Sequence, residues 1–276
     1  MKKNSETVSV VIATLGGDIN STINSLNNGS VCPKEIIVSL PSRHQRLINL
    51  TSHSNVKVVY AEKFGQVDQR IYGFNKAKGS LVLQLDDDVI FQYECLENLV
   101  SELIALPRNS SISPTFYNLD GQAFYQAQRK GVLAKIYYYI VNGKRGFVPG
   151  GVTSAGTNFG VNPDDIGDNI VEVEWQTGGC VLHRRDNILL KSYFPFSGKS
   201  YCEDLISSFL LREKGVTLYV STKALCSAPR KRQIFVGKEL VKDFRARLYF
   251  VRMAKLSVAR MLVHYVAHII RALKFR

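Results

Sequence analysis

Short apolar runs alternate with helical patterns through the first 90 residues of the chain. Four runs rich in Val, Ile and Leu have the length and composition of buried strands. These runs are residues 8–12, 35–39, 56–60 and 81–85. Helical spacing begins at about Asp18 and recurs over residues 66–78, where Gly79 ends it. Strands that alternate with helices in this way predict an α/β fold, with an open, mostly parallel sheet flanked by helices.

The pattern is less regular beyond the fourth run. Residues 107–170 are rich in Gly, Asn, Pro and Tyr, and we expect loops with a short helix there, covering one edge of the sheet. Further sheet segments are expected at residues 171–175, 179–182 and 216–220, with a helix at residues 202–214. Beyond Lys231 the pattern is helical and basic, which predicts a second module.

The positive charge of the chain is concentrated at its C-terminal end. The formal net charge is +13, from 36 Lys or Arg and 23 Asp or Glu. Residues 229–276 hold 13 of the cations against only Glu239 and Asp243, so this segment alone carries +11. Such a segment favours an anionic partner, meaning lipid headgroups, nucleic acid or acidic protein.

The cysteines and the apolar stretches bear on the location of the protein. Five cysteines are scattered without a Cys-x-x-Cys pair, and no secretory signal precedes Val8. We therefore expect reduced thiols and a cytoplasmic location. Lys255 and Arg260 interrupt the most apolar stretch before it reaches 18 residues, so we expect no membrane-spanning helix.

Three consecutive aspartates, Asp86, Asp87 and Asp88, follow the fourth predicted strand. Ligands on open α/β sheets bind outside the carboxyl ends of the strands, so this position suggests a binding site. Adjacent carboxylates repel one another, and their oxygen atoms suit Mg²⁺ or Mn²⁺ that also bridges a diphosphate. The alternative is an acidic surface turn that caps the next helix.

Six short motifs in this order resemble those of the family 2 glycosyltransferases of the GT-A fold, bacterial surface-glycan type, over roughly residues 7–225. They are residues 8–14, residues 35–38, Gly65-Gln66 with Gln69-Arg70 and Gly73, residues 85–88, residues 175–180, and Glu203-Asp204. Residues 85–88 look like the DxD element of the family, and residues 175–180 are similar to its acceptor-side loop. Glu203-Asp204, at the head of a predicted helix, resembles its ED motif.

The resemblance implies a role for each matched position. On the nucleotide-sugar side it implies Ala13 and Thr14 at the nucleoside, Gln66, Arg70 at the nucleotide, and Asp86 and Asp87, one of which would meet the ribose. Asp88, with Asp86, would hold the metal ion, Mn²⁺ or Mg²⁺. On the acceptor side it implies Trp175, Gly178 and Gly179. Asp204, beside Glu203, would be the general base that takes the proton from the acceptor hydroxyl.

The expected reaction moves a sugar from a nucleotide-diphosphate sugar to a glycan or lipid-linked acceptor, in cell-surface polysaccharide synthesis. One base, one metal ion and no obvious second nucleophile favour a single displacement with inversion. The family usually has acidic residues just after the second strand, where this chain has Leu40-Pro41, so the base of the donor stays open. We expect a catalytic domain at residues 1–228, with a nucleotide-sugar half at 1–106 and an acceptor half at 107–228.

The C-terminal segment, residues 229–276, has the pattern of an amphipathic helix. Cationic and apolar side chains fall on opposite sides of a helix drawn through its last part. The first set is Arg260, His264, His268 and Arg271, and the second is Leu262, Val266, Ile269, Ile270 and Leu273. This pattern suits a helix at an anionic membrane surface, which would make the enzyme peripheral on the inner face of the membrane. The alternative is a helix packed on the catalytic domain.

Other functions fit the sequence less well. A sugar-nucleotide nucleotidyltransferase usually has a basic, Gly-rich phosphate loop after the first strand, whereas residues 15–18 read Leu-Gly-Gly-Asp. A non-catalytic protein bound to membrane surfaces needs neither the aspartate triplet nor Glu203-Asp204. A nucleic-acid partner is not expected, because no known nucleic-acid-binding module accompanies the basic segment.

Overall fold

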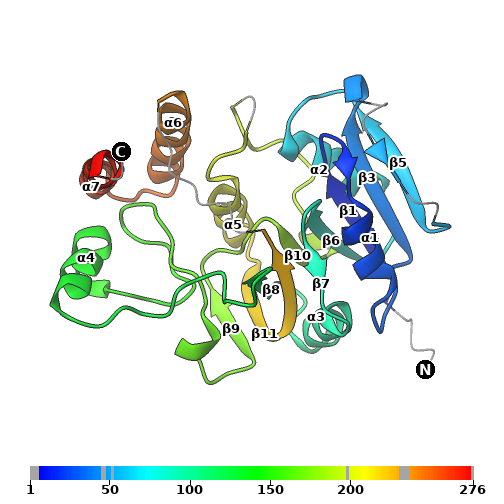
Figure 1. Cartoon of the computed structure of the whole chain (residues 1–276), viewed down its shortest axis with the longest axis horizontal. Coiled ribbons are helices and arrows are strands. Elements are labelled where there is room, and N and C mark those ends of the chain that lie inside the picture. Colours follow the sequence, from blue (N-terminus) through cyan, green and yellow to red (C-terminus); the bar gives the residue numbers. More distant parts are fainter. Residues whose placement is uncertain (1–5, 45–47, 51–52, 197–198, 230–236, 275–276) are drawn as a thin grey trace.

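The computed structural model describes residues 6–44, 48–50, 53–196, 199–229 and 237–274, without the side chains of residues 44, 48–49 and 271–274. A central sheet separates two groups of helices, and three further helices lie together at one end of the molecule (Figure 1). The strand order is β5-β3-β1-β6-β10-β8-β11-β7, and β9 pairs with β11.

The sheet is parallel in its N-terminal half and mixed beyond it. β5, β3, β1 and β6 pair in parallel, β10 runs antiparallel to both β6 and β8, and β11 runs parallel to β8. The strands are β1 (Val8–Ala13), β3 (Glu35–Pro41), β5 (Val56–Ala61), β6 (Leu81–Asp86), β7 (Ile90–Phe91), β8 (Ser110–Asn118), β9 (Ile170–Val173), β10 (Cys180–Arg184) and β11 (Thr217–Ala228), with β2 (Gly17–Asp18) and β4 (Ile48–Asn49) paired separately. Because the carboxyl ends of β1, β3 and β6 meet at one edge, the residues that follow them are brought together there.

Helices cover both faces of the sheet, so its central strands are buried on both sides. The helices are α1 (Asn20–Asn27), α2 (Gln66–Lys76), α3 (Cys95–Ala105), α4 (Val132–Asn142), α5 (Glu203–Glu213), α6 (Lys238–Met253) and α7 (Val258–Lys274). α1 and α3 pack on one face, and α2 packs on the other face of β1 and β3. Gly73 makes the approach of α2 possible, because a Cβ atom there would lie 2.4 Å from Val11 Cγ1.

The α/β fold and the four N-terminal strands confirm the predictions from the sequence. The expectation of loops and a short helix for residues 107–170 was incomplete. α4 is the short helix, but β8 is a buried strand in the middle of the sheet. Its sequence contains three serines and Pro114, and Pro is rare inside the strands of a sheet. Burial is tolerated because its hydroxyl groups find partners, for example Thr115 Oγ1, which donates to the carbonyl of Ser221.

The C-terminal segment is helical, as expected, and α6 packs into the core of the molecule. Phe250 on α6 is buried in a cluster with Trp175, Leu205 and Ile206. The boundary predicted at residue 228 stays a prediction, because residues 230–236 lie outside the described residues, as do the side chains of Arg271 and Leu273 from the expected amphipathic pattern. Among the described helices, none is both long and apolar enough to cross a membrane.

Candidate active site

The aspartate triplet lies at the carboxyl end of β6, as the sequence predicts. Asp86 is the last residue of this strand, and its backbone N–H donates to the carbonyl of Gly179 at 2.8 Å. Its Oδ1 atom accepts from Arg70 Nη2 at 2.6 Å and from Gln66 Nε2 at 3.1 Å. Burial raises the pKa of Asp86, the Arg70 charge opposes this, and the nearby Asp88 charge adds to it.

Arg70 connects the aspartate triplet to the start of α5. Its side chain is 2% exposed, and its guanidinium lies between Asp86 and Glu203, with Nη1 donating to Glu203 Oε2 at 2.7 Å. Burial alone would lower the pKa of Arg70, but the two carboxylates outweigh it and raise the pKa. The resemblance assigns Arg70 to the nucleotide, and that role stays a prediction. In the structure Arg70 joins two carboxylates.

Glu203 and Asp204 form the first turn of α5, where carboxylates favour the positive end of the helix dipole. Glu203 is buried and accepts from both Arg70 and the hydroxyl of Tyr193. Cys202, immediately before them, has a left-handed backbone with φ of 56°, which is uncommon for a residue with a side chain. The chain thus turns sharply just where these two carboxylates begin.

Asp204 is only partly buried, and it forms no ion pair with another described side chain. Its Oδ1 atom accepts from the backbone N–H of Leu205 at 2.9 Å. Burial, with the charge of neighbouring Glu203, raises the pKa of Asp204 to about 6. A carboxylate with such a pKa is ionised at neutral pH and is more basic than an ordinary aspartate, as a general base requires.

Gly178 and Gly179 allow the loop after β9 to touch this charged cluster. A Cβ atom on Gly178 would lie 2.9 Å from Glu203 Oε2 and 3.5 Å from both Arg70 Nη1 and Asp204 Cβ. On Gly179 it would lie 3.2 Å from Asp86 Oδ2. The resemblance implies that these glycines lie on the acceptor side; in the structure they let the backbone approach the carboxylates.

Thr14 and Ala13 lie at the end of β1, next to the triplet. Ala13 pairs with Asp86 in the sheet, and the Thr14 hydroxyl donates to Asp87 Oδ2. Gln69 Nε2 donates to the carbonyls of Thr14 and Ser39, which holds the ends of β1 and β3 together. Both Ala13 and Thr14 are largely buried, so in this structure they shape the edge of the site more than they line an open pocket.

Trp175, expected on the acceptor side, is largely buried. It packs among α5 and α6 residues, and its indole Nε1 donates to the carbonyl of Phe159 at 2.8 Å. The Trp175 side chain therefore holds the loop at residues 150–160 against α5, and it also lines a small pocket together with Tyr125 and Thr177, so its acceptor-side role stays a prediction. The hydroxyl of Tyr125 and Thr177 Oγ1, 2.6 Å apart, make a second link between these loops.

The oxygen donors at the edge of the sheet suit a divalent cation that arrives with a diphosphate. Asp86 and Asp88 are partly exposed there and close enough for one charge to affect the other. The described residues contain no group of three or more His, Cys, Asp or Glu that could hold a metal ion by itself. Mg²⁺ in nucleotide sites commonly uses one or two carboxylates, substrate phosphates and water, so the two carboxylates fit this role.

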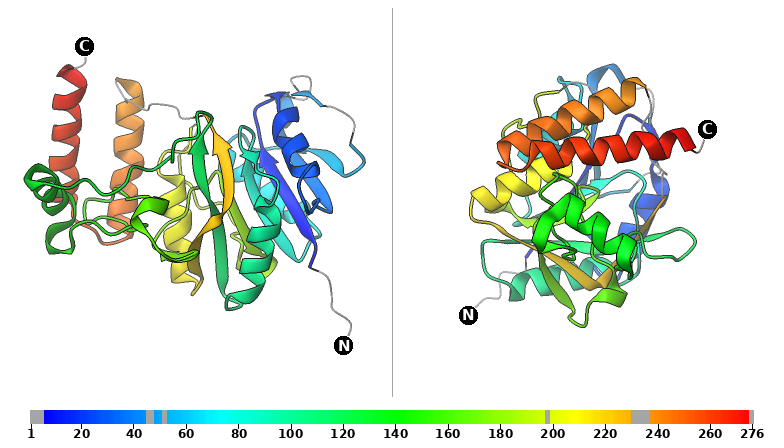
Figure 2. Two further views of the ribbon diagram at one scale, coloured as in Figure 1. Left: turned by 60° about the horizontal axis from the view of Figure 1, so that its bottom comes forward. Right: turned by 90° about the vertical axis from the view of Figure 1, so that its left-hand side faces the viewer.

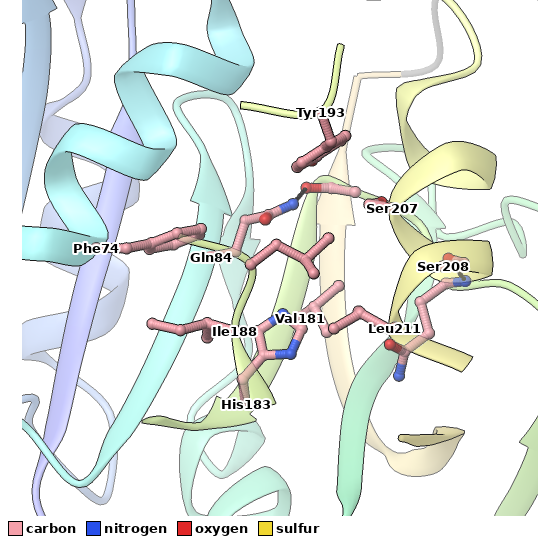
Figure 3. Close-up of a pocket in the computed structure, with 12 residues that line it drawn as sticks. Phe74, Gln84, Val181, His183, Ile188, Tyr193, Ser207, Ser208 and Leu211 are labelled. Carbon is pink, nitrogen blue, oxygen red and sulfur yellow. Dashed lines mark hydrogen bonds between the residues drawn. The ribbon is translucent and has the colours of Figure 1, made fainter. Parts of the chain in front are cut away.

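Several residues of the cluster escaped the analysis of the sequence. Tyr193 lies in an irregular loop without a recognisable sequence pattern. Gln84 lies within a strand whose sequence is mostly apolar, and its side chain points toward the loop that contains Gly178 and Gly179, which we call the glycine loop. Gln84 Nε2 donates to the carbonyl of Gly178 at 2.5 Å. Figure 3 shows both side chains beside a pocket whose other lining is mostly apolar, including Phe74 and Ile188. Gly178 of the glycine loop also lines this pocket. Because the lining is mostly apolar, the pocket does not suit a charged nucleotide-sugar donor.

Comparisons with known proteins agree with this geometry. The family model described as "Glycosyl transferase family 2" matches residues 9–157, more than half of the chain. The matched range holds the aspartate triplet and Arg70 but ends before Glu203 and Asp204. No curated protein sequence matches the chain.

Solved structures show the same fold. The structure of GalNAc-T7 with UDP, GalNAc and Mn²⁺ is 15% identical, with a TM-score of 0.57, over 89% of this chain and 48% of that one. Residues 1–349 of TarS from S. aureus are 17% identical, with a TM-score of 0.52, over 92% and 68% of the two chains. A mycobacterial protein is 12% identical, with a TM-score of 0.51, over 90% and 76%. This chain spans about half the length of the GalNAc-T7 structure, and the likeness shows an α/β fold of the GT-A type.

Proposed function

This chain belongs to glycosyl transferase family 2, and we propose that it transfers a sugar from a nucleotide-diphosphate sugar to an acceptor hydroxyl, with inversion at the anomeric carbon. The observation that carries the proposal is the buried bridge Asp86–Arg70–Glu203, with ion pairs of 2.6 and 2.7 Å. It fixes the end of β6 against the start of α5. The carboxylates for the donor and the carboxylate for the acceptor proton thereby meet at one edge of the sheet.

Asp204 is the proposed general base. Glu203 forms an ion pair with Arg70 and accepts a hydrogen bond from the hydroxyl of Tyr193, whereas burial and the charge of Glu203 raise the pKa of Asp204 to about 6. The difference gives the two neighbours different tasks: Glu203 positions, and Asp204 removes the proton from the attacking hydroxyl. A single base on the side opposite the leaving group gives displacement with inversion, through an oxocarbenium-like transition state.

Asp88 and Asp86 would hold Mn²⁺ or Mg²⁺. The metal would neutralise charge on the departing nucleotide diphosphate, as a Lewis acid does. Support comes from the oxygen donors at the end of β6 and from the Mn²⁺ in the structure of GalNAc-T7. Within this chain, Arg70 and Gln66 restrain Asp86 through Oδ1 and leave Oδ2 directed at the glycine loop.

The donor is a nucleotide-diphosphate sugar, and the acceptor is a glycan or a lipid-linked glycan precursor of a cell-surface polysaccharide. Support for such a donor comes from family membership and from the UDP bound to GalNAc-T7. The base of the nucleotide stays open, because Leu40-Pro41 replaces the acidic residues usual after the second strand. A nucleotidyltransferase and a non-catalytic binding protein are disfavoured, since the family match covers the aspartate triplet.

A panel of nucleotide sugars tests the proposal. The full chain would be incubated with each donor, with Mn²⁺ or Mg²⁺, and with water or an added glycan as the acceptor of the sugar. Mass spectrometry would follow the release of nucleoside diphosphate and the protection of the chain against proteolysis by the bound donor. We expect turnover with a narrow set of donors, lost in excess chelator and restored by added metal. Full turnover in excess chelator would contradict the metal-dependent mechanism, and no binding of any nucleotide sugar would contradict the function itself.

A further inference from the structure

Helix α4 has its apolar side turned to solvent. Leu133 is 83% exposed, and Ile136 is 51% exposed. The full set of exposed large apolar residues on this helix is Val132, Leu133, Ile136, Tyr137, Tyr139 and Ile140. The opposite side, with Tyr138 and Val141, is the one that packs inward. Amphipathic helices of globular proteins normally bury their apolar side, so this exposed side requires a partner.

Helix α7 exposes a second apolar set beside the first. Met261 and Tyr265 pack inward, and Tyr265 contacts Phe244 of α6. The exposed set on α7 is Leu262, Val263, Val266, Ile269 and Ile270. Both helices lie at one end of the molecule, and they are nearest the viewer when that end is seen directly (Figure 2, right).

Arg260 joins the two helices into one surface. Its Nη1 atom donates to the carbonyls of Tyr139 and Ile140 at 2.5 and 2.7 Å, at the end of α4, and its guanidinium lies over the Tyr139 ring. We call the two exposed sets together the α4–α7 face. Exposed apolar side chains gathered on two neighbouring helices are typical of an interaction site.

The sequence around the α4–α7 face is strongly cationic. Residues 126–146, which contain α4, hold five cations and no Asp or Glu. The cations are Arg129, Lys130, Lys135, Lys144 and Arg145. Residues 229–276, which contain α7, carry +11. The positive charge of the chain is therefore concentrated in the two segments that expose apolar helices.

We propose that the α4–α7 face binds an anionic lipid bilayer. Apolar side chains would enter the boundary between headgroups and acyl chains, and the surrounding cations would meet the lipid phosphates. The negative potential of the cytoplasmic leaflet places the enzyme on the inner face of the membrane, as a peripheral protein. The partner is the anionic membrane surface expected from the sequence, but the binding surface differs: it consists of two packed helices, with α6 anchoring them, where the amphipathic helix of residues 229–276 was expected to bind. The inference is independent of the transfer reaction.

Charge decides between a bilayer and a second copy of the chain. A symmetric dimer through this face would bring two copies of both cationic segments together, and like charges across an interface oppose association. An anionic lipid surface attracts the same charges. The face is also built in advance, since Arg260 and Tyr265 fix α7 against α4 and α6, so no segment needs to fold on binding.

Co-sedimentation of the full chain with vesicles tests the proposal. Vesicles of phosphatidylglycerol and phosphatidylcholine would be compared with phosphatidylcholine alone, for the wild type, Ile136→Asp and Val266→Asp. The matched control is Ile104→Asp on α3, because Ile104 is 48% exposed and α3 lies away from the end of the molecule that holds α4 and α7 (Figure 1). All three substitutions add the same charge, so only the place of the residue differs.

We expect the wild type to bind the anionic vesicles, and both Ile136→Asp and Val266→Asp to weaken this binding at least about tenfold, because each removes inserted apolar surface. Ile104→Asp should bind as the wild type does. Thermal unfolding of each variant shows whether its fold is intact. The proposal is overturned if Ile136→Asp in its folded state binds vesicles as well as Ile104→Asp does. It is also overturned if light scattering shows a wild-type dimer that Ile136→Asp dissociates, since a second copy would then cover the face.

Discussion

At the carboxyl edge of the sheet this protein buries charge, whereas at the α4–α7 end it exposes apolar side chains. Arg70 is almost fully buried between Asp86 and Glu203, and the glycine loop closes over them without a side chain. At the other end, Leu133 and Val266 are exposed to solvent, and the segments that contain them are rich in Lys and Arg. Each region departs from the usual rule of apolar inside and charged outside.

The difference shows how each departure is compensated. The buried charges at the sheet edge are compensated within the chain, because ion pairs and hydrogen bonds satisfy them. Large apolar side chains of α4 and α7, such as Leu133 and Val266, stay exposed to solvent in the described structure, and we infer that an outside partner covers them. A cluster whose charges are paired within the chain suits a rigid catalytic site. A surface of exposed apolar side chains suits a docking site.

Removal of Arg70 should destabilise the edge of the sheet strongly. Arg70→Met leaves the buried Glu203 and the partly exposed Asp86 without their cation, which costs about 3–5 kcal/mol. The matched control is Arg145→Met, which breaks the half-exposed pair with Glu174 and should cost less than about 1 kcal/mol. Urea unfolding of both variants measures the two free energies. Equal losses would contradict the view that the buried bridge holds the edge together.

Phe250→Ala tests whether helix α6 is part of the packed domain, in contrast to the exposed side of helix α7. Phe250 on α6 is buried against Trp175 and Leu205, so its truncation should cost about 3–5 kcal/mol. Val266→Ala on α7 removes exposed surface and should change the free energy of unfolding by less than about 0.5 kcal/mol. A negligible cost for Phe250→Ala would mean that α6 is an appendage, as the boundary expected at residue 228 implies.

Gly178→Ala tests the close approach of the glycine loop. The added Cβ atom would meet Glu203 Oε2 at 2.9 Å, so the cluster must shift, at about 1–3 kcal/mol. We expect turnover to fall as well, because the shift displaces Asp204. Gly167→Ala is the control, since no atom lies within 4 Å of its new Cβ. If the two alanine variants behave alike, the contact has no bearing on the site.

The rate should depend on pH in a way set by Asp204. Its pKa is raised to about 6, chiefly by burial, and a general base acts only when ionised. The rate at low substrate should therefore be level above about pH 7 and should fall about tenfold per unit below pH 6. With a base that has the pKa of an ordinary aspartate, the rate would stay level down to about pH 4. A profile that falls only near pH 4 would show that burial does not perturb the base.

The sequence predicted the parts of this structure that depend on local pattern. β1, β3, β5 and β6 follow from their apolar runs, and the aspartate triplet lies where the end of a strand places it. Contacts between distant segments could not be predicted in this way: the partners of Arg70 are 16 and 133 residues away. The role of Gly178 depends on which side chain faces it, and only the packed structure shows that.

Helix α4 shows that the exposure of a side chain also could not be predicted from the sequence. Its apolar pattern is visible in the sequence, but a pattern cannot tell whether an apolar side packs on the domain or faces out. Trp175 is the reverse case, since an aromatic residue in a motif loop proves to be buried. Exposure is a property of the folded chain, so both the α4–α7 face and the inner position of Trp175 required the structure.

Replacement of Asp204 tests the central claim most directly. Asp204→Asn should lower kcat by about 10²–10⁴, the usual loss when general-base help is removed, while calorimetry should show unchanged donor affinity. Asp164→Asn, at an exposed aspartate in a connecting turn, should leave both quantities unchanged. Product formation would be measured with the best donor of the panel. Wild-type turnover by Asp204→Asn together with an inactive Glu203→Gln would contradict the account, because the base would then be the residue that Arg70 neutralises.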